Sequence, residues 1–282
     1  MPGNGSQSIL CPVDFSETSA LGLRFAYALT QGSPAHLTAF YADQFLPPPY
    51  FTESGLEDMR KHLKGAAVAA GDHLRQFASR TLGGVRIATQ IVEALPVDGI
   101  LQAARNISAD LIVLGTHGRS GFNRLMLGSV AERILRASEI PVLTVPPSTS
   151  GLPGSPEFTR ILVPVNGSEA ARSALEYAGR LARCFSTELT VLHVWEDGKD
   201  GAIPELCEWV PKELRANCRL VELPEGEGAA HSILSASSDL GCDLLVLGAR
   251  RRRFFDSTII GTTSARVVRH AACPVLTVIS RE

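Results

Sequence analysis

The amino-acid sequence predicts two tandem α/β domains, each a five-stranded parallel sheet with helices on both faces. Three observations predict this fold class. Short apolar runs alternate with amphipathic segments along the 282 residues. The runs LIVL and LLVL are nearly continuous, as expected for strands that are buried on both faces. The whole pattern occurs twice, so the second half of the chain is a copy of the first.

The repeat is defined by four pairs of matching segments. The first two pairs have an offset of 152 residues and the last two an offset of 133, so the second copy is shorter by 19 residues. This difference arises between positions 43 and 109, where the first copy contains the Pro-rich segment DQFLPPPYFTESG. The pairs are ILCPVDFSE (9–17) with ILVPVNGSE (161–169), LTAFYAD (37–43) with LTVLHVW (189–195), ADLIVLG (109–115) with CDLLVLG (242–248), and IPVLTV (140–145) with CPVLTV (273–278).

The elements of the first copy follow from its apolar pattern. The expected strands are residues 8–13, 36–42, 85–91, 110–114 and 141–145, and the expected helices are near 17–31, 55–80, 97–106 and 129–137. The stretch PPSTSGLPGSPEF between the copies consists of turn and breaker residues. We therefore place the first domain at 1–146, a linker at 147–157 and the second domain at 158–282.

Composition and charge exclude several classes of protein. The formal net charge of −2 gives no global reason to expect a nucleic-acid partner, so an anion site must be local. The first residues, MPGNGSQS, lack the basic and apolar regions of a signal peptide. No apolar run approaches the roughly 18 residues needed to cross a bilayer. We expect a cytoplasmic protein that binds neither nucleic acid nor membranes.

The cysteines and histidines give no metal-binding pattern. The six cysteines form no C-x-x-C pair, and four lie in or beside apolar segments, which predicts reduced core thiols. Five histidines lack metal-ligand spacing, so we expect no zinc site. They are His36, His62, His73, His231 and His270.

The loop GTHGRSGFNRLMLGS (115–129) is the strongest candidate for a ligand site. It follows an expected strand, as PVDFS does, and ligands of parallel sheets bind beyond the carboxyl ends of the strands. Gly115 and Gly118 are expected to allow backbone conformations and a close ligand approach that a Cβ atom would prevent. Gly128 and Ser129 open the next helix, whose unpaired N–H groups favour an anion.

Further donors in this loop are His117 and Arg119. The loop lacks the G-K-[ST] ending of a Walker A motif, so it offers no P-loop lysine. Two interpretations remain: a phosphate-binding loop, or a surface connection in which Ser129 only caps the helix. His117 as a general base is the weaker idea, since no adjacent nucleophile or orienting group is evident.

Several motifs together resemble the universal stress protein family. They are V-D-F-S after the first strand, A-D-L-I-V-L-G-T-H-G-R-S-G after the fourth, the G-x2-G-x9-G-S spacing, and the closing P-V-L-T-V. The resemblance covers both halves of the chain. It implies a tandem member with Rossmann-like, adenine nucleotide alpha hydrolase-like domains that bind an adenine nucleotide.

The resemblance also implies positions for the ligand contacts. Pro12, Val13 and Asp14 would flank the nucleoside, and Ala42 would lie near the base. Asp14 has a structural alternative, because V-D-x-S also forms a strand-end turn with a helix cap. The triphosphate would be surrounded by Gly115, His117, Gly118, Arg119, Gly128, Ser129 and Val130.

The second copy departs from this pattern in GARRRRFFDSTIIGTT (248–263). Gly248, Gly261 and Thr262 are kept, whereas Arg251 replaces Gly118 and Asn166 replaces Asp14. The run Arg250–Arg253 could bind an anion through its side chains or form a solvated basic turn. We expect the second domain to bind nucleotide weakly, differently or not at all.

The expected function is a stress-response regulator that binds ATP, with Mg²⁺, in its first domain. Binding groups are present, but a base or water-positioning constellation is not. The alternatives are slow ATP hydrolysis assisted by Arg250–Arg253 and a nucleotide-independent interaction module. The resemblance further implies that PVLTV of each copy pairs edge to edge, giving an intramolecular pseudo-dimer. A homodimer of two chains is a further expectation left open.

Overall fold

The computed structural model describes residues 7–32, 34–43, 53–118, 127–151, 156–195, 208–210, 212–250, 252–254, 257–259 and 261–280. In the first half, strands and helices alternate from the start to the fifth strand. The elements are β1 (Gln7–Pro12), α1 (Glu17–Gly32), β2 (Ala35–Asp43), α2 (Glu53–Thr81), β3 (Ala88–Glu93), α3 (Pro96–Asn106), β4 (Leu111–Gly115), α4 (Ser129–Ala137) and β5 (Val142–Val145).

A short 3-10 helix, η1 (Pro147–Gly151), leads into the second half. The second half follows a similar order, except that its described residues have the 3-10 helix η2 where the first half has α2, and that it contains a small hairpin. Its elements are β6 (Arg160–Val165), α5 (Glu169–Phe185), β7 (Glu188–Trp195), η2 (Lys212–Asn217), β8 (Cys218–Pro224), α7 (Ala229–Asp239), β9 (Leu244–Arg250), β10 (Arg252–Phe254), β11 (Ser257–Ile259), α8 (Thr262–His270) and β12 (Val275–Ser280).

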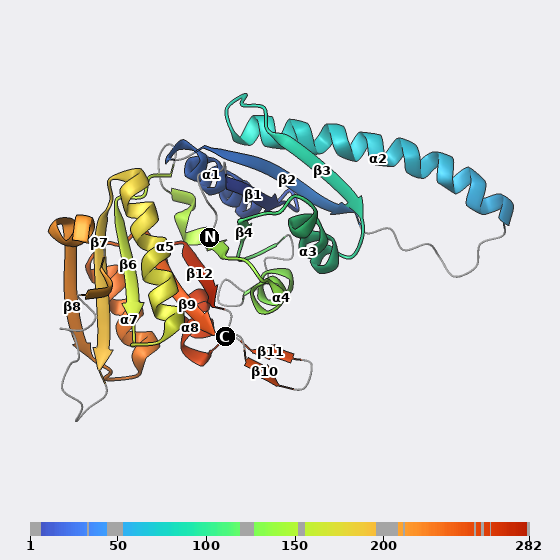
Figure 1. Cartoon of the computed structure of the whole chain (residues 1–282). Coiled ribbons are helices and arrows are strands. Elements are labelled where there is room, and N and C mark those ends of the chain that lie inside the picture. The colour runs from blue at the N-terminus through green and yellow to red at the C-terminus, as the bar shows by residue number, and fades with distance from the viewer. Residues whose placement is uncertain are drawn as a thin grey trace.

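All strands except the hairpin join one ten-stranded sheet with the order β3-β2-β1-β4-β5-β12-β9-β6-β7-β8 (Figure 1). The five strands of each half are parallel to one another. The halves meet at β5 and β12, which pair antiparallel with Leu143 opposite Leu276. We call this β5–β12 pair the seam. The pairing that the resemblance implied for the two PVLTV segments is therefore present.

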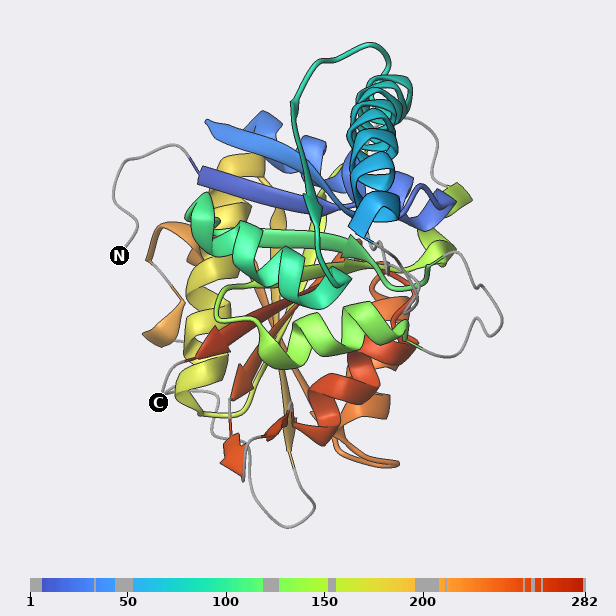
Figure 2. The same ribbon diagram turned by 90° about the vertical axis from the view of Figure 1, so that its right-hand side faces the viewer.

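Helices cover both faces of the sheet (Figure 2). On one face α1, α2 and α5 contribute to a core that includes Leu23, Leu74 and Leu175. On the other face α3, α4, α7 and α8 contribute to a second core that includes Ile134 and Val267. Each core contains residues from both halves of the chain, because the sheet beneath it is continuous across the seam. The predicted α/β class with parallel strands and two covered faces is confirmed.

The expected elements of the first half are present with small shifts at their ends. The largest shift concerns β3, which begins at Ala88 and not at 85. Gly83 and Gly84 have φ values of 64° and 95° and turn the chain after α2, so pairing with β2 starts only where Ala88 meets Thr38. The hairpin β10–β11 lies inside a segment that the sequence suggested to be a loop.

One aspartate of each repeat has a structural role. Asp110 precedes β4 and accepts a hydrogen bond from the Ser8 backbone N–H at 2.9 Å. Asp243 precedes β9 and accepts one from the Thr159 backbone N–H at 2.7 Å. Each carboxylate satisfies an amide at the start of the neighbouring strand, which explains why A-D-L and C-D-L occur at matching positions.

The cysteines of the described residues are all free. Burial raises the pKa of the Cys242 thiol to about 12, and it also raises the pKa values of Cys11 and Cys273. These three thiols therefore stay protonated at neutral pH and behave as core residues, as the sequence suggested. Cys184 is exposed, and Cys207 lies outside the described residues.

Candidate functional site

The candidate site lies where the order of the strands reverses in the first half. The strand order β3-β2-β1-β4-β5 places β1 and β4 side by side, with the chain leaving them toward opposite sides of the sheet. The carboxyl ends of such a pair form a crevice in open parallel sheets. Asp14 follows β1, and Thr116, His117 and Gly118 follow β4, so both motifs of the sequence reach this crevice.

A cavity of about 470 Å³ occupies the crevice. This volume falls within the range of small-molecule sites, roughly 300–1,000 Å³. Ten of the eleven residues chosen from the sequence line it, and the eleventh, Arg119, lies outside the described residues. The ten are Pro12, Val13, Asp14, Ala42, Gly115, His117, Gly118, Gly128, Ser129 and Val130.

One carboxylate oxygen of Asp14 has a structural role, and the other lies beside Gly118 in the cavity. Its Oδ1 accepts hydrogen bonds from the Ser16 N–H at 3.0 Å and from the Ser16 hydroxyl, which forms the turn into α1. Its Oδ2 lies on the side of Gly118, 2.9 Å from the point that a Cβ of residue 118 would occupy. In the second half Asn166 makes the same turn with Ser168. The turn thus needs an oxygen acceptor but no negative charge.

His117 is held by its neighbours and directs one nitrogen into the protein without a partner. Its carbonyl accepts a hydrogen bond from the Thr18 hydroxyl at 2.7 Å, and its Nδ1 lies 2.8 Å from the Thr116 hydroxyl. Its Nε2 is buried and has no hydrogen-bond partner among the described residues. A buried imidazole nitrogen without a partner is costly, and a bound molecule in the adjoining cavity would supply one.

Gly115 serves close packing, and the expectation that Gly115 and Gly118 use backbone conformations that a Cβ would prevent is wrong. None of Gly115, Gly118 and Gly128 has a φ in the left-handed region. A Cβ on Gly115 would lie 2.8 Å from the Thr18 carbonyl oxygen, so this glycine lets α1 approach β4. A Cβ on Gly118 would meet only the end of the Asp14 side chain, and Gly118 is exposed at the cavity.

Helix α4 presents its amino-terminal end to the cavity. Gly128 is the N-cap residue and makes no side-chain cap, while its own N–H donates to the Thr116 carbonyl at 2.7 Å. Ser129, Val130 and Ala131 line the cavity with the first turn of the helix. The alternative that Ser129 caps the helix is not met, since Gly128 holds the N-cap position. The first-turn N–H groups and the helix dipole favour an anion here.

The opposite end of the cavity contains residues that sequence reasoning missed. Phe40, Tyr41 and Asp43 come from the end of β2, and Pro96 and Ile100 from the start of α3. Their positions in the sequence could have indicated them. They lie at the end of an expected strand and at the start of an expected helix, and both of these points lie at the carboxyl end of the parallel strands. The mixture of an aromatic ring, apolar side chains and one carboxylate suits a base with polar edges.

The segment of the second half that corresponds to this loop contains a hairpin. Arg250 is the last residue of β9, Arg251 lies outside the described residues, and Arg252 and Arg253 begin β10. The hairpin β10–β11 follows directly, and β11 lies against α4 of the first half (Figure 1). The second half therefore carries a hairpin where the first half carries its glycine-rich loop.

The register across the seam separates the arginine run from the cavity. Gly115 pairs with Val145, which lies level with the amino end of β12, whereas Arg250 pairs with Ser280 at the carboxyl end of β12. Six strand residues span about 20 Å at roughly 3.3 Å per residue. Because the two halves pair antiparallel, the carboxyl ends of their strands point in opposite directions.

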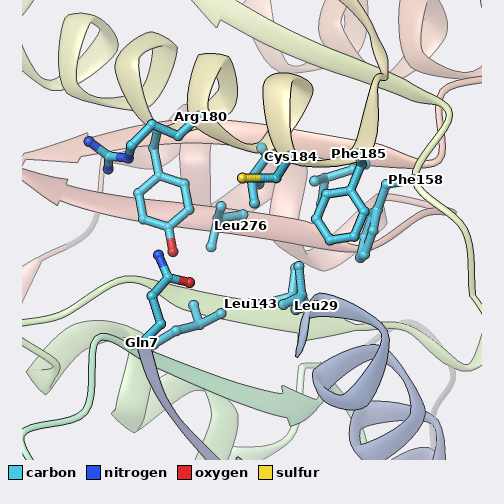
Figure 3. A pocket seen from close by; sticks show the side chains of 12 residues that line it. Gln7, Leu29, Leu143, Phe158, Arg180, Cys184, Phe185 and Leu276 are labelled. Atoms are coloured by element: carbon cyan, nitrogen blue, oxygen red, sulfur yellow. The ribbon is translucent and has the colours of Figure 1, made fainter. Parts of the chain in front are cut away.

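A second, much smaller cavity lies at the junction of the two halves (Figure 3). Figure 3 shows Leu143 and Leu276 of the seam together with Leu29 of α1 and the α5 residues Cys184 and Phe185. Its volume is about 30 Å³, which holds about one water molecule. This cavity is a packing gap between α1 and α5 and is too small for a cofactor.

The described part of the chain offers neither a metal-ligand cluster nor a membrane-spanning helix. Within it, no cluster of three or more His, Cys, Asp or Glu side chains is arranged to hold a metal ion. The described helices include none that is long and apolar enough to cross a membrane.

Fold and site together define a tandem α/β protein with an open pocket at the point of strand reversal in its first half. Comparison with known proteins gives the family. The family model of the universal stress proteins matches residues 5–146 and again 157–278. The chain belongs to the universal stress protein family, and it contains two such domains.

Individual relatives agree with this assignment. A universal stress protein of Methanocaldococcus jannaschii is 32% identical over 142 residues, which is 49% of this chain and 81% of the relative. One of Mycobacterium tuberculosis is 25% identical over 299 residues and 97% of each chain. The crystal structure of a universal stress protein from Archaeoglobus fulgidus covers 99% of both chains with a TM-score of 0.70 at 22% identity, which shows a shared fold.

Proposed function

We propose that the first domain binds one adenine nucleotide, ATP with Mg²⁺, and that the chain acts as a stress-response regulator without efficient catalysis. The observation that carries this proposal is the cavity of about 470 Å³, lined by the motif residues that follow β1 and β4. Membership of the universal stress protein family supports the choice of an adenine nucleotide. The domain boundaries proposed from the sequence, 1–146 and 158–282, place the cavity within the first domain.

The phosphate end of the site is the side formed by α4 and the loop after β4. The N–H groups of the first turn of α4, the Ser129 hydroxyl and His117 Nε2 are donors that a phosphate oxygen satisfies. Gly118 leaves room for the phosphate chain beside Asp14. Mg²⁺ would accompany the triphosphate. Arg119 is the further cation that the sequence offers.

The nucleoside end is the side formed by β1, β2 and α3. Val13 and Ala42 flank this part of the cavity, and Pro96 and Ile100 close it from above the sheet. A base is held there by apolar contact and by the backbone polar groups at the strand ends. Asp14 is the side chain that would receive the ribose hydroxyls or a base amine.

Efficient catalysis is not part of the proposal, for two physical reasons. The imidazole of His117 has a hydroxyl at Nδ1 and, within the described residues, no carboxylate partner that would orient it as a base. The arginine run of the second half begins about 20 Å along the strand direction from Gly115, at roughly 3.3 Å per residue. Assistance of hydrolysis by Arg250 of the same chain is therefore disfavoured. A nucleotide-independent interaction module is disfavoured by the open cavity itself.

The experiment that tests the proposal is calorimetric titration of the purified chain with ATP and Mg²⁺, with ADP, AMP and cyclic AMP as comparison ligands. We expect one site per chain. Gly118→Arg copies the residue of the second half and should weaken binding by about 100-fold or more, which is about 2.7 kcal/mol. The fold should be retained, because Gly118 is exposed and its added side chain points at solvent and Asp14.

The matched control is Gly261→Arg in the second half. Gly261 is exposed with open space around it, so this variant adds the same side chain without touching the cavity, and it should bind as the wild type does. Two equally tight sites per chain would contradict the proposal, as would unchanged affinity in Gly118→Arg. Mass spectrometry of nucleotide released from the freshly purified protein identifies the natural ligand.

A further inference from the structure

Phe15, which follows Asp14, has a backbone conformation that side chains rarely adopt. Its φ is 65°, in the left-handed region where a residue with a Cβ atom is strained. The equivalent residue of the second half is Gly167, whose φ is 74°. Both halves thus need the same backbone turn, but only the second uses the residue that makes it without strain. Strain of this kind persists only when surrounding contacts fix it, and it is often found beside functional sites.

An aromatic cluster fixes Phe15 in this conformation. The ring of Phe15 packs against Tyr41 of β2, with ring centroids 4.8 Å apart. It also meets His73 and Phe77 of α2 edge-on, at 4.5 Å and 5.4 Å. Edge-on aromatic pairs at these distances are favourable beyond the burial of apolar area. His73 and Phe77, two of these partners of the Phe15 ring, belong to α2.

The phenylalanine and the long helix occur together in the chain. The first half has Phe15 and the 29-residue helix α2 between β2 and β3. Between β7 and β8, the described residues of the second half contain the short η2, and the turn residue there is Gly167. In Figure 1, α2 passes along β3 and continues well beyond the sheet at its amino-terminal end. Where its side chains are described, α2 exposes residues such as Val68, Asp72 and Gln76.

We propose that Phe15 is a positioning residue that couples α2 to the nucleotide pocket. This inference rests on the proposed function of the first domain. Phe15 does not line the cavity, but Asp14 does, and the two are adjacent in the turn that Asp14 Oδ1 forms with Ser16. The aromatic cluster fixes the turn at Phe15, and this turn keeps the Asp14 carboxylate directed toward Gly118. A ligand that binds Asp14 therefore stabilises the turn, and through the aromatic cluster it also stabilises α2. Occupation of the pocket thereby changes the stability of α2, which lies on the outside of the protein.

The first test is a double-mutant cycle on ATP affinity, measured by calorimetry. Phe15→Gly copies the second half, relieves the strain and removes the ring, and should weaken ATP binding by about tenfold or more. His73→Ala alters only an exposed α2 residue, and should weaken binding by about threefold in the wild type but have no further effect with Phe15→Gly. Phe15→Tyr keeps the ring and should bind normally. Gln76→Ala, on an exposed position of the same helix, is the matched control and should bind normally.

The second test is amide hydrogen exchange of α2, which a merely structural role of Phe15 would not link to the ligand. Addition of ATP should slow the exchange of residues 70–80 by about threefold or more in the wild type, and should leave it unchanged in Phe15→Gly at saturating ATP. Normal ATP affinity in Phe15→Gly, or α2 exchange that ignores ATP in the wild type, would overturn the coupling alone. Failure of the wild-type chain to bind any nucleotide would overturn the proposed function and the coupling together.

Discussion

Gly115 and Gly118 lie in the same glycine-rich loop but have different uses in the structure. Gly115 and Gly248 hold matching positions, and each lets a helix approach the end of a strand. A Cβ would lie 2.8 Å from the Thr18 oxygen at Gly115 and 2.2 Å from the Ala170 oxygen at Gly248. Both copies therefore retain this glycine for packing. Among the described residues Gly118 has no such neighbour in the backbone, and the second copy carries an arginine at this position.

Gly115→Ala should therefore destabilise the protein, whereas Gly118→Ala should not. The added methyl group at residue 115 overlaps backbone atoms of α1, which should lower the free energy of unfolding by about 1–3 kcal/mol. At residue 118 the methyl group meets only a side-chain end, so the change should stay within about 0.5 kcal/mol. Urea denaturation of the two variants measures both values. Equal stabilities would contradict the packing role of Gly115.

At the scale of elements, the seam is nearly but not fully symmetric. Thr144 of β5 and Thr277 of β12 are equivalent residues, and both are completely buried. The Thr144 hydroxyl donates to the Val275 carbonyl at 3.2 Å. The Thr277 hydroxyl finds no partner among the described residues. A buried hydroxyl without a partner keeps its desolvation cost and gains nothing in return.

Valine substitutions at the two positions should consequently have opposite effects. Thr277→Val removes the hydroxyl that lacks a partner and should raise the free energy of unfolding by about 1 kcal/mol. Thr144→Val removes a hydrogen bond and should lower it by about 0.5–1.5 kcal/mol. Chemical denaturation of each variant beside the wild type gives the two signs. The same sign for both would show that the hydroxyls are equivalent.

The hairpin β10–β11 shows why the sequence was informative for some elements and not for others. The strands of the main sheet are recognisable in the sequence as apolar runs, because both of their faces are buried. The segment 252–259 carries arginines, an aspartate and a serine, which are typical of a loop, and in the structure its strand β11 contacts α4. The start of β3 was also missed, because its limit is set by the partner residues on β2.

The candidate site was predictable to a similar degree and for a related reason. Asp14, His117 and Gly118 lie in short motifs directly after strands, so the topology of a parallel sheet brings them together. Tyr41 and Ile100 belong to ordinary apolar segments and become lining residues only through the packing of α3 on β2. Nothing in the sequence of the first copy indicated the left-handed conformation of Phe15. It becomes recognisable only when Phe15 is aligned with its counterpart in the second copy, Gly167.

At the scale of the whole molecule, the two domains share their interior. Phe25 of α1 packs on Phe158, and Phe158 packs on Phe185 of α5, with ring centroids 6.0 Å and 5.3 Å apart. Gly32 at the end of α1 leaves room for the ring of Phe185. Both hydrophobic cores run across the seam, so neither domain could unfold without exposing the apolar surface of the other.

The chain should therefore unfold as one cooperative unit in spite of its two domains. Differential scanning calorimetry should give a single peak whose calorimetric and van't Hoff enthalpies agree. Saturating ATP should move the whole peak to higher temperature, because a ligand of the native state stabilises everything that unfolds with its site. Two resolved peaks, with one insensitive to ATP, would show that the domains unfold independently.

The connection between the two domains has a consequence for how the copies could diverge. Two separate polypeptides joined at such a seam would dissociate on dilution. Each could also pair with a second copy of itself in place of the other polypeptide. In this chain a linker joins β5 of the first domain to β6 of the second, so the association of the two domains at the seam is intramolecular and does not depend on concentration. Each molecule contains one domain of each kind at every expression level. The second copy was thus free to exchange its glycine-rich loop for a hairpin while it continued to shield the sheet edge of the first.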